Sequence, residues 1–267
     1  MFTYLRRILS ICIIILNLIL LPTAFNLINI IPVMVFKRKP RSLLLYYIWA
    51  RINGWAIFTI YPCKWKLPST SFTQHQNYIL ISNHKSLLDI LIISSLLQPH
   101  LPIIHFVMKS SLKWQIPGAG LTCYLLGYPM LRRYSYRDIK KNPQLAQQDL
   151  KAIEKSFNLP KAFQCYCIFP EGTRAAGGHP EYHPLGPPKY SGLAHLVELM
   201  RSQTQAFRII DCDIIYPEKT FSLKQFLTKQ QTIEIDLNEI NPDTIPSTKD
   251  YLTSTECRLA FQKHFKK

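Results

Sequence analysis

The first 88 residues of the chain contain neither aspartate nor glutamate. Ten lysines and arginines lie in the same stretch, and after Asp89 no further acid occurs until Asp138. The whole chain has 32 Lys and Arg against 16 Asp and Glu, a formal net charge of +16. This balance suits nucleic acid, an anionic membrane surface or a substrate that carries phosphate.

The chain also lacks the cysteine spacing of a disulfide-bonded scaffold. Its seven cysteines are odd in number, none forms C-x-x-C, and the closest pair is Cys165 and Cys167. A chain of 267 residues is long enough to bury a core without disulfides. We therefore expect a reducing compartment, with most of these thiols in the core.

Charge is absent between Ile8 and Phe36, a run of 29 residues that are mostly Leu, Ile, Val, Phe or Ala. One straight helix of that length would be about 43 Å long, and a single span needs only about 20 residues. Pro22 and Pro32 interrupt the run, so residues 1–45 are predicted to form either one N-terminal hydrophobic helix or a broken helical hairpin. The helix would span a membrane, whereas the hairpin would keep both flanking basic clusters on the cytoplasmic face. A cleaved signal peptide is disfavoured, because no A-x-A site follows the run cleanly.

Residues 46–61, YYIWARINGWAIFTIY, are rich in aromatic side chains. Such a segment is typical of an element at the level of the lipid headgroups, and a core helix under the following domain is equally consistent. We take residues 46–74 as an interfacial aromatic segment and linker. Residues 75–267 show no internal repeat and no obvious boundary, so they are predicted to form one globular domain.

From Tyr78 onward, short apolar runs alternate with helical patterns. The runs predict buried strands at 78–82, 102–109, 163–169, 207–217 and 231–237. Helices are predicted at 87–98, 143–156 and 190–202. This alternation favours an α/β fold, a mixed sheet flanked by helices.

The segment SNHKSLLDI, residues 82–90, places a histidine and the first acid of the chain just after the first predicted strand. Ligand sites in open α/β sheets gather at the carboxyl ends of strands. Asp89 stands among leucines and isoleucines, so it should be buried and need a partner. It can cap the following helix with Ser86, in the pattern S-x-x-D, and it can also fix the tautomer of His84 and balance an imidazolium. Taken alone, H-x4-D is a weak motif.

A more specific motif is FPEGTR, which ends at Arg174 and again follows a predicted strand. Pro170 ends the strand, Gly172 permits a tight turn, and Thr173 with nearby amides can face an anion. Arg174 can hold a phosphate through two hydrogen bonds, and Glu171 can anchor the loop or bind a hydroxyl.

Two further segments are less specific. GYPMLRR ends at Arg132 and Arg133 and suits a phosphate site, although alone it would be read as a solvated basic turn. HPEYH, with His179 and His183, has a spacing that could hold zinc on a helix. It lies in a loop rich in Gly and Pro, which favours solvated histidines, so no metal site is predicted.

NHKSLLD and FPEGTR together closely resemble the glycerolipid acyltransferases, the lysophosphatidic acid acyltransferase family. The pattern of that family is N-H-x4-D, then G-x-x-[FL]-[IL]-x-R, then [FV]-P-E-G-[ST]-R. FVMKSSLKWQIPGAG is similar to its connecting segment, with Lys109 at the usual lysine. PMLRRYSYRDI and LGPPKYSGLA look most like the subgroup of bacterial inner-membrane and lysocardiolipin-type enzymes. The resemblance covers residues 75–217 and departs from the family where Met130 replaces an aromatic residue and where the late V-P-[IV]-x-P motif keeps only Pro217.

The resemblance implies a glycerol-3-phosphate acyltransferase-like fold and acyl transfer from a thioester to the free hydroxyl of a lysophospholipid, first of all lysophosphatidate at sn-2. His84 would be the general base, oriented by Asp89, with no protein nucleophile, metal or cofactor. Backbone amides near Gly172 could stabilise the oxyanion. The residues expected to bind substrate are Lys109, Arg132, Arg133, Glu171, Gly172, Thr173 and Arg174.

The implied donor is acyl-CoA or acyl-carrier protein. The implied location is a membrane, with the catalytic domain on the cytoplasmic face of a bacterial inner membrane or its equivalent. Another acceptor such as lysocardiolipin stays open. A non-enzymatic basic protein that binds membrane or nucleic acid is disfavoured, because no nucleic-acid motif occurs and the chain starts with an apolar run.

Overall fold

The computed structural model describes most of the chain, in segments separated by short gaps and two longer ones. The described residues are 2–38, 40, 43–60, 64–66, 71–86, 88–116, 118–134, 136–142, 144–158, 163–170, 190–203, 205–216, 232–249, 251 and 254–265.

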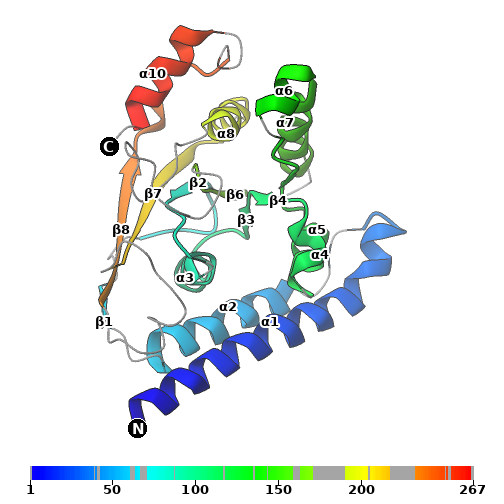
Figure 1. Cartoon of the computed structure of the whole chain (residues 1–267), viewed down its shortest axis with the longest axis vertical. Helices are drawn as coiled ribbons and strands as arrows, with labels where there is room; N and C mark the ends of the chain where they lie inside the picture. Colours follow the sequence, from blue (N-terminus) through cyan, green and yellow to red (C-terminus); the bar gives the residue numbers. More distant parts are fainter. Residues whose placement is uncertain are drawn as a thin grey trace.

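Two helices, α1 (Phe2–Met34) and α2 (Leu43–Trp55), lie side by side in opposite directions along one side of the molecule (Figure 1). A π-helical turn, η1 (Ala56–Ile60), continues α2. By length and composition alone, α1 is the one helix in the described part of the chain that could cross a membrane.

Helix α1 passes through Pro22 and Pro32 without ending, so the broken hairpin is not observed. Pro22 has no N–H, so it cannot donate to the carbonyl of Leu18 within the helix. The helix packs on α5 (Ala119–Leu125) at this level: Thr122 Oγ1 lies 2.9 Å from Asn26 Oδ1 and 3.2 Å from Pro22 O, and Asn26 Nδ2 donates to Gly118 O at 2.8 Å. Tertiary contacts with α5 therefore accompany the helix where its own sequence favours a break.

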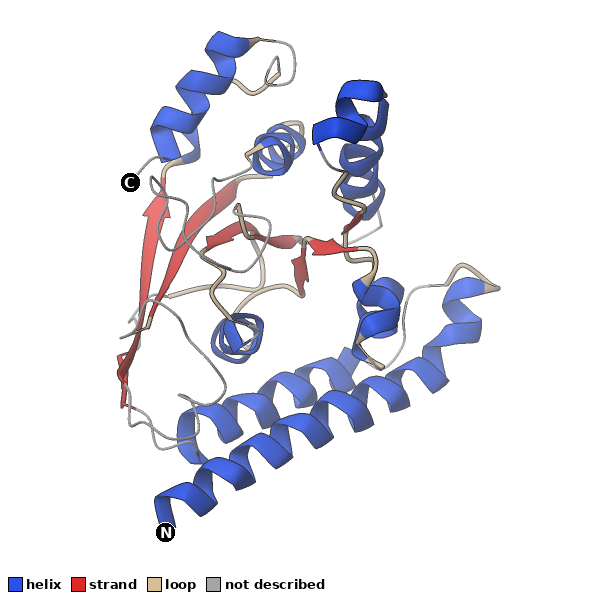
Figure 2. Cartoon of the chain, in the orientation of Figure 1, coloured by secondary structure: helices blue, strands red, loops and turns tan. Residues whose placement is uncertain are grey.

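A six-stranded sheet forms the centre of the molecule, in the order β1-β8-β7-β2-β6-β3 (Figure 2). Neighbouring strands are parallel except for β7 and β8, which are antiparallel. The strands are β1 (Lys64–Lys66), β2 (Asn77–Ser82), β3 (Ile104–Phe106), β6 (Cys165–Ile168), β7 (Phe207–Ile215) and β8 (Thr232–Ile240). The prediction of a mixed sheet flanked by helices is confirmed, together with a long apolar helix at the N-terminus.

The central strand β2 sends alternate side chains into two separate cores. Tyr78 and Leu80 belong to the core shared with α1, α2, α3 and α5, whereas Ile79 and Ile81 belong to the core shared with α7, α8 and α10. The sheet therefore lies between two helical layers (Figure 1). The helices not yet bounded are α3 (Leu88–Leu97), α4 (Leu112–Gln115), α6 (Tyr136–Lys141), α7 (Gln144–Phe157), α8 (Ser191–Arg201), η2 (Pro242–Thr244) and α10 (Thr255–Phe265).

The single strand predicted at 102–109 is wrong, because the chain changes partners at Val107. β3 pairs with β6 in the main sheet, and β4 (Met108–Lys109) pairs with β5 (Met130–Leu131) in a separate two-stranded sheet. Val107 N donates to Cys167 O at 2.9 Å, and the next amide, Met108 N, donates to Pro129 O at 3.0 Å. A continuous apolar run conceals such an exchange, since the side chains stay apolar across it.

Candidate active site

Three parallel strands end at the same edge of the sheet and bring distant segments together. β2 leads into His84, β6 into Phe169 and β7 into Tyr216. Because β2 lies between β6 and β7, the segment of His84 is flanked on both sides. This edge is the usual place for a ligand site in an α/β sheet.

His84 and Asp89 form a hydrogen-bonded pair at this edge. The imidazole Nδ1 lies 3.1 Å from Asp89 Oδ2, and the same oxygen accepts from Lys85 N at 2.7 Å and Ser86 N at 2.8 Å. The other oxygen, Oδ1, accepts from the Tyr216 hydroxyl. The Asp89 side chain is fully buried, whereas that of His84 is 13% exposed. Four donors thus compensate the carboxylate for its loss of water.

The start of α3 accounts for the position of this carboxylate. Ser86 N donates to the Asp89 side chain, as in a capping box, and Ser86 Oγ accepts from Leu88 N at 3.2 Å. The cap restricts the Asp89 rotamer and directs Oδ2 toward the imidazole. The two roles considered from the sequence, helix cap and histidine partner, are therefore carried by one carboxylate.

Asn83 ties the end of β2 to β7. Its Nδ2 donates to Ile214 O at 2.9 Å, and its Oδ1 accepts from Ile214 N at 3.0 Å. The side chain thereby extends the parallel β2–β7 pairing beyond its last matched residues, Ser82 and Cys212. This fixes the segment of His84 relative to the end of β7.

The His84 ring stacks on Phe169, with ring centroids 4.3 Å apart and planes 21° apart. Phe169 in turn stacks on Phe106, at 6.1 Å and 14°. The stack limits rotation of the imidazole, and the bond from Nδ1 to Asp89 leaves Nε2 as the ring nitrogen that can accept a proton. These contacts therefore fix the direction in which the imidazole ring faces.

The arginine turn, Arg132 and Arg133, follows β5 and is held by α7. Asp149 Oδ1 accepts from Arg132 N at 2.7 Å, and Asp149 Oδ2 accepts from Arg133 N at 2.9 Å. Arg133 has a φ of 57°, a left-handed backbone that most side chains avoid, and the two hydrogen bonds stabilise it there. Burial lowers the pKa of Arg133, and Asp149 partly offsets that effect.

The same small sheet brings in the predicted lysine. Lys109 of β4 is exposed and pairs with Leu131, the residue before Arg132. Arg133 Nη2 also donates to Val107 O at 3.4 Å, beside the end of β3. Lys109, Arg132 and Arg133 therefore share one basic element on the β3 side of the dyad.

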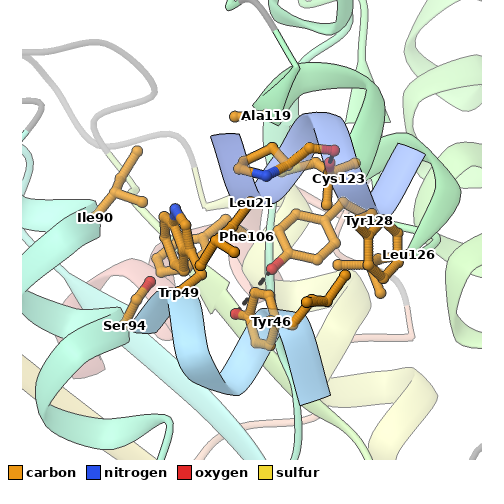
Figure 3. A pocket seen from close by; sticks show the side chains of 14 residues that line it. Leu21, Tyr46, Trp49, Ile90, Ser94, Phe106, Ala119, Cys123, Leu126 and Tyr128 are labelled. Atoms are coloured by element: carbon orange, nitrogen blue, oxygen red, sulfur yellow. Dashed lines mark hydrogen bonds between the residues drawn. The ribbon is translucent and has the colours of Figure 1, made fainter. Parts of the chain in front are cut away.

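An apolar pocket, partly open to solvent, lies beneath α3 between α1, α2, β3 and α5. Two of its lining residues lie next to the dyad (Figure 3): Phe106 belongs to the ring stack, and Ile90 follows Asp89 in α3. The hydroxyls of Tyr46 and Tyr128 are 3.1 Å apart in its wall. Such a pocket suits a long apolar group with its polar end near His84.

Three thiols in the sheet are buried. Burial raises the pKa of Cys212 to about 12, against a hydrogen bond with Ser82 that lowers it. Burial also holds the pKa of Cys167 well above its usual value, with added effects of Cys212, Cys165 and Asp89. The expectation of core thiols holds for these three, whereas Cys123 and Cys257 are only partly buried and Cys12 is exposed. The raised pKa values argue against a thiolate nucleophile in the sheet.

Several predicted residues lie outside the described part of the chain. Phe169 and Pro170 are described, but the rest of FPEGTR is not, and neither is HPEYH. Within the described ranges, no group of three His, Cys, Asp or Glu side chains could hold a metal ion. The residues outside the described ranges are Glu171, Gly172, Thr173, Arg174, His179 and His183.

The sequence did not reveal three contributors to this site. Asn83 is the first residue of the N-H-x4-D pattern, but the sequence assigned it no role. Asp149 acts through backbone groups, which leave no pattern of side-chain types. Tyr216 is 127 residues from Asp89, and its only signal was its place before Pro217 at the end of a predicted strand.

Comparison with known proteins gives a family and similar solved structures. A family model described as Acyltransferase matches residues 67–216, more than half of the chain. The chain is similar to the crystal structure of the 1-acyl-sn-glycerophosphate (LPA) acyltransferase PlsC from Thermotoga maritima, with 18% identity and a TM-score of 0.47. That similarity covers 93% of this chain and 96% of the other. No curated protein matches.

Proposed function

The chain belongs to the acyltransferase family, and we propose that it transfers a fatty acyl group from an acyl thioester to the free hydroxyl of a lysophospholipid. The first acceptor to consider is lysophosphatidate, whose sn-2 hydroxyl would be acylated to give phosphatidate. The observation that carries this proposal is the His84–Asp89 pair, with Nδ1 bound to a buried carboxylate and, among the described residues, no hydrogen bond at Nε2.

In the proposed reaction, His84 Nε2 removes the proton from the acceptor hydroxyl as its oxygen attacks the thioester carbonyl. Asp89 stabilises the imidazolium that forms. When the tetrahedral intermediate collapses, the C–S bond breaks and the leaving thiolate takes the proton back from His84. The acyl group passes directly to the acceptor, so this chemistry needs neither a protein nucleophile nor a cofactor. Backbone amides of Gly172 and Thr173 would stabilise the oxyanion.

The acceptor phosphate would bind to Arg133 and Lys109, with Arg132 and Arg174 adding charge. Asp149 supports this role because it holds the arginine turn through backbone amides. An arginine can bind phosphate with two hydrogen bonds, whereas a lysine acts as a point charge. Glu171 would anchor its loop or bind a hydroxyl of the acceptor.

The acyl chain of the donor would enter the apolar pocket beneath α3. Its carbonyl end would then meet the acceptor near the stacked rings of His84, Phe169 and Phe106. Acyl-CoA and acyl-carrier protein both present such a chain as a thioester.

We also propose that α1 lies along the membrane surface rather than crossing the bilayer alone. Its polar side chains bind α2, η1 and the start of α5: Ser10 Oγ donates to Ala56 O at 2.7 Å, Asn17 Nδ2 donates to Trp49 O at 2.9 Å, and Asn26 Nδ2 donates to Gly118 O at 2.8 Å. Its other side is exposed and apolar, as expected of a helix in contact with lipid. The exposed residues there include Leu5, Leu9, Leu16, Leu20, Leu27 and Ile31.

Labelling of single cysteines would test this arrangement. In sealed vesicles, a membrane-impermeant maleimide should reach Thr3→Cys and Phe36→Cys from the same side, the cytoplasmic one. Labelling from opposite sides would establish a single span.

The proposed activity is tested by offering the detergent-purified protein lysophosphatidate with acyl-CoA or with acyl-carrier protein, and identifying the product by mass. A product heavier than the acceptor by one acyl group supports the proposal. PMLRRYSYRDI and LGPPKYSGLA favour lysocardiolipin as a second acceptor, so the same assay should include it. A chain that acylates no lysophospholipid with either donor contradicts the proposal.

A further inference from the structure

We infer that Tyr216 is a positioning residue for the dyad: its hydroxyl holds the second oxygen of Asp89 and so sets how the carboxylate meets His84. The inference rests on the proposed function and adds to it a residue that no motif identifies.

The hydrogen bonds to the carboxylate are divided unequally between its two oxygens. Oδ2 accepts from His84, Lys85 and Ser86, all of which are local to the start of α3. Oδ1 faces away from these donors and accepts from Tyr216. A carboxylate held at one oxygen can still rotate about its last bond, and a donor on the second oxygen fixes its plane. Both side chains are buried, Asp89 at 0% and Tyr216 at 5% exposure, so water competes weakly for this bond.

The position of the Tyr216 hydroxyl is restricted by the strands on either side of it. Tyr216 directly follows β7, and Asn83 binds both backbone groups of Ile214 in that strand. The histidine loop and the end of β7 are thereby connected on either side of the carboxylate. The thiols of Cys167 and Cys212 from β6 and β7 are also near Asp89, and burial keeps both protonated.

The expected consequence is electrostatic as well as steric. The Tyr216 hydroxyl draws part of the carboxylate charge toward Oδ1, away from the imidazole. Without it, Asp89 should attract the imidazolium more strongly and orient the ring less well. Catalysis should then become slower, and the pH dependence of kcat/KM should change.

The test compares Tyr216→Phe, which removes only one oxygen, with the wild-type chain and with Tyr251→Phe. Tyr251 is a matched control, because it is buried on the α10 side of the sheet and bonds Gln262. We expect kcat of Tyr216→Phe to fall about 10- to 100-fold, with KM for acceptor and donor changed less than about threefold. The acidic limb of its kcat/KM profile should move to higher pH. Tyr251→Phe should leave both readouts as in the wild type.

A double-mutant cycle keeps the test independent of catalysis. Tyr216→Phe should lower the urea midpoint of unfolding in the wild-type background and lower it less in an Asp89→Ala background, because the hydroxyl has lost its partner. Equal effects in both backgrounds, or a Tyr216→Phe enzyme with wild-type kcat and pH profile, would overturn the inference while the acyltransferase activity stands. A wild-type chain that makes no product would instead contradict the proposed function.

Discussion

The Asn83 side chain makes two hydrogen bonds to one residue of another strand, Ile214, through its nitrogen and its oxygen. It thus acts as one further backbone unit in the β2–β7 pairing, placed immediately before His84. The catalytic histidine of the proposal is therefore attached to the sheet by a side chain that has no chemical role of its own.

Replacing Asn83 with Ala should leave the backbone N–H and C=O of Ile214 without these partners. We expect the free energy of unfolding to fall by about 1–3 kcal/mol and kcat to fall with it, because the His84 loop loses its attachment. Urea unfolding and the acyl-transfer assay measure the two effects. Asn238→Ala is the control, since that exposed side chain bonds only Asp236 among the contacts described for it, and it should cost less than about 0.5 kcal/mol. Equal losses in the two variants would refute the role of Asn83.

Asp149→Asn tests the two hydrogen bonds by which Asp149 holds the backbone of Arg132 and Arg133. An amide presents an N–H₂ group to one of the two backbone amides that the carboxylate binds, so one hydrogen bond becomes a repulsion. We expect KM for lysophosphatidate to rise about tenfold, and kcat to change little, because Arg133 is held less well for the phosphate.

The matched control is Asp138→Asn, which removes the same charge from the neighbouring helix α6. It should leave KM for lysophosphatidate within about twofold of the wild type, since exposed charges are well screened. If Asp138→Asn raises KM as much as Asp149→Asn does, the change in net charge explains the effect, and the hydrogen bonds from Asp149 to the arginine turn do not.

Much of this site could be predicted from the sequence, because short spacings and apolar strands leave a local pattern. Contacts between distant segments leave none and could not be predicted. His84 and Asp89 are five positions apart, so a strand end and one helical turn suffice to bring them together. β2, β6, β7 and β8 were recognisable because buried strands need apolar residues. In contrast, the packing of α1 on α5 around Pro22 brings in Thr122 from 100 residues away, and the contact of Tyr216 with Asp89 depends on the β2–β7 register. Neither relationship leaves a local pattern.

Ala119→Phe tests the pocket as the site of the acyl chain. Ala119 lines the pocket at the start of α5, and a ring there would fill part of its space. We expect the variant to use long-chain donors less well relative to short-chain donors, measured as the ratio of kcat/KM within the same preparation. Because both values come from one preparation, the fraction of misfolded protein cancels in the ratio, and no separate control is needed. An unchanged ratio, with activity retained, would place the acyl chain elsewhere.

The raised thiol pKa values predict protection from alkylation. A Cys whose pKa is raised stays protonated at pH 8, and only the thiolate reacts quickly. Cys167 and Cys212 should therefore stay unlabelled by iodoacetamide in the folded protein at pH 8, and both should be labelled in urea. Peptide mass spectrometry reads out each site. Rapid labelling of either thiol in the folded state would show that this part of the sheet opens readily.

The most direct test of the central claim is acyl transfer by His84→Ala. The account predicts that this variant still folds and binds membranes, although it melts somewhat below the wild type, because Asp89 loses one of its four donors while three remain. Its rate of lysophosphatidate acylation should fall by at least about 1,000-fold, as expected when a general base is lost. An His84→Ala protein that acylates lysophosphatidate at the wild-type rate would contradict the account.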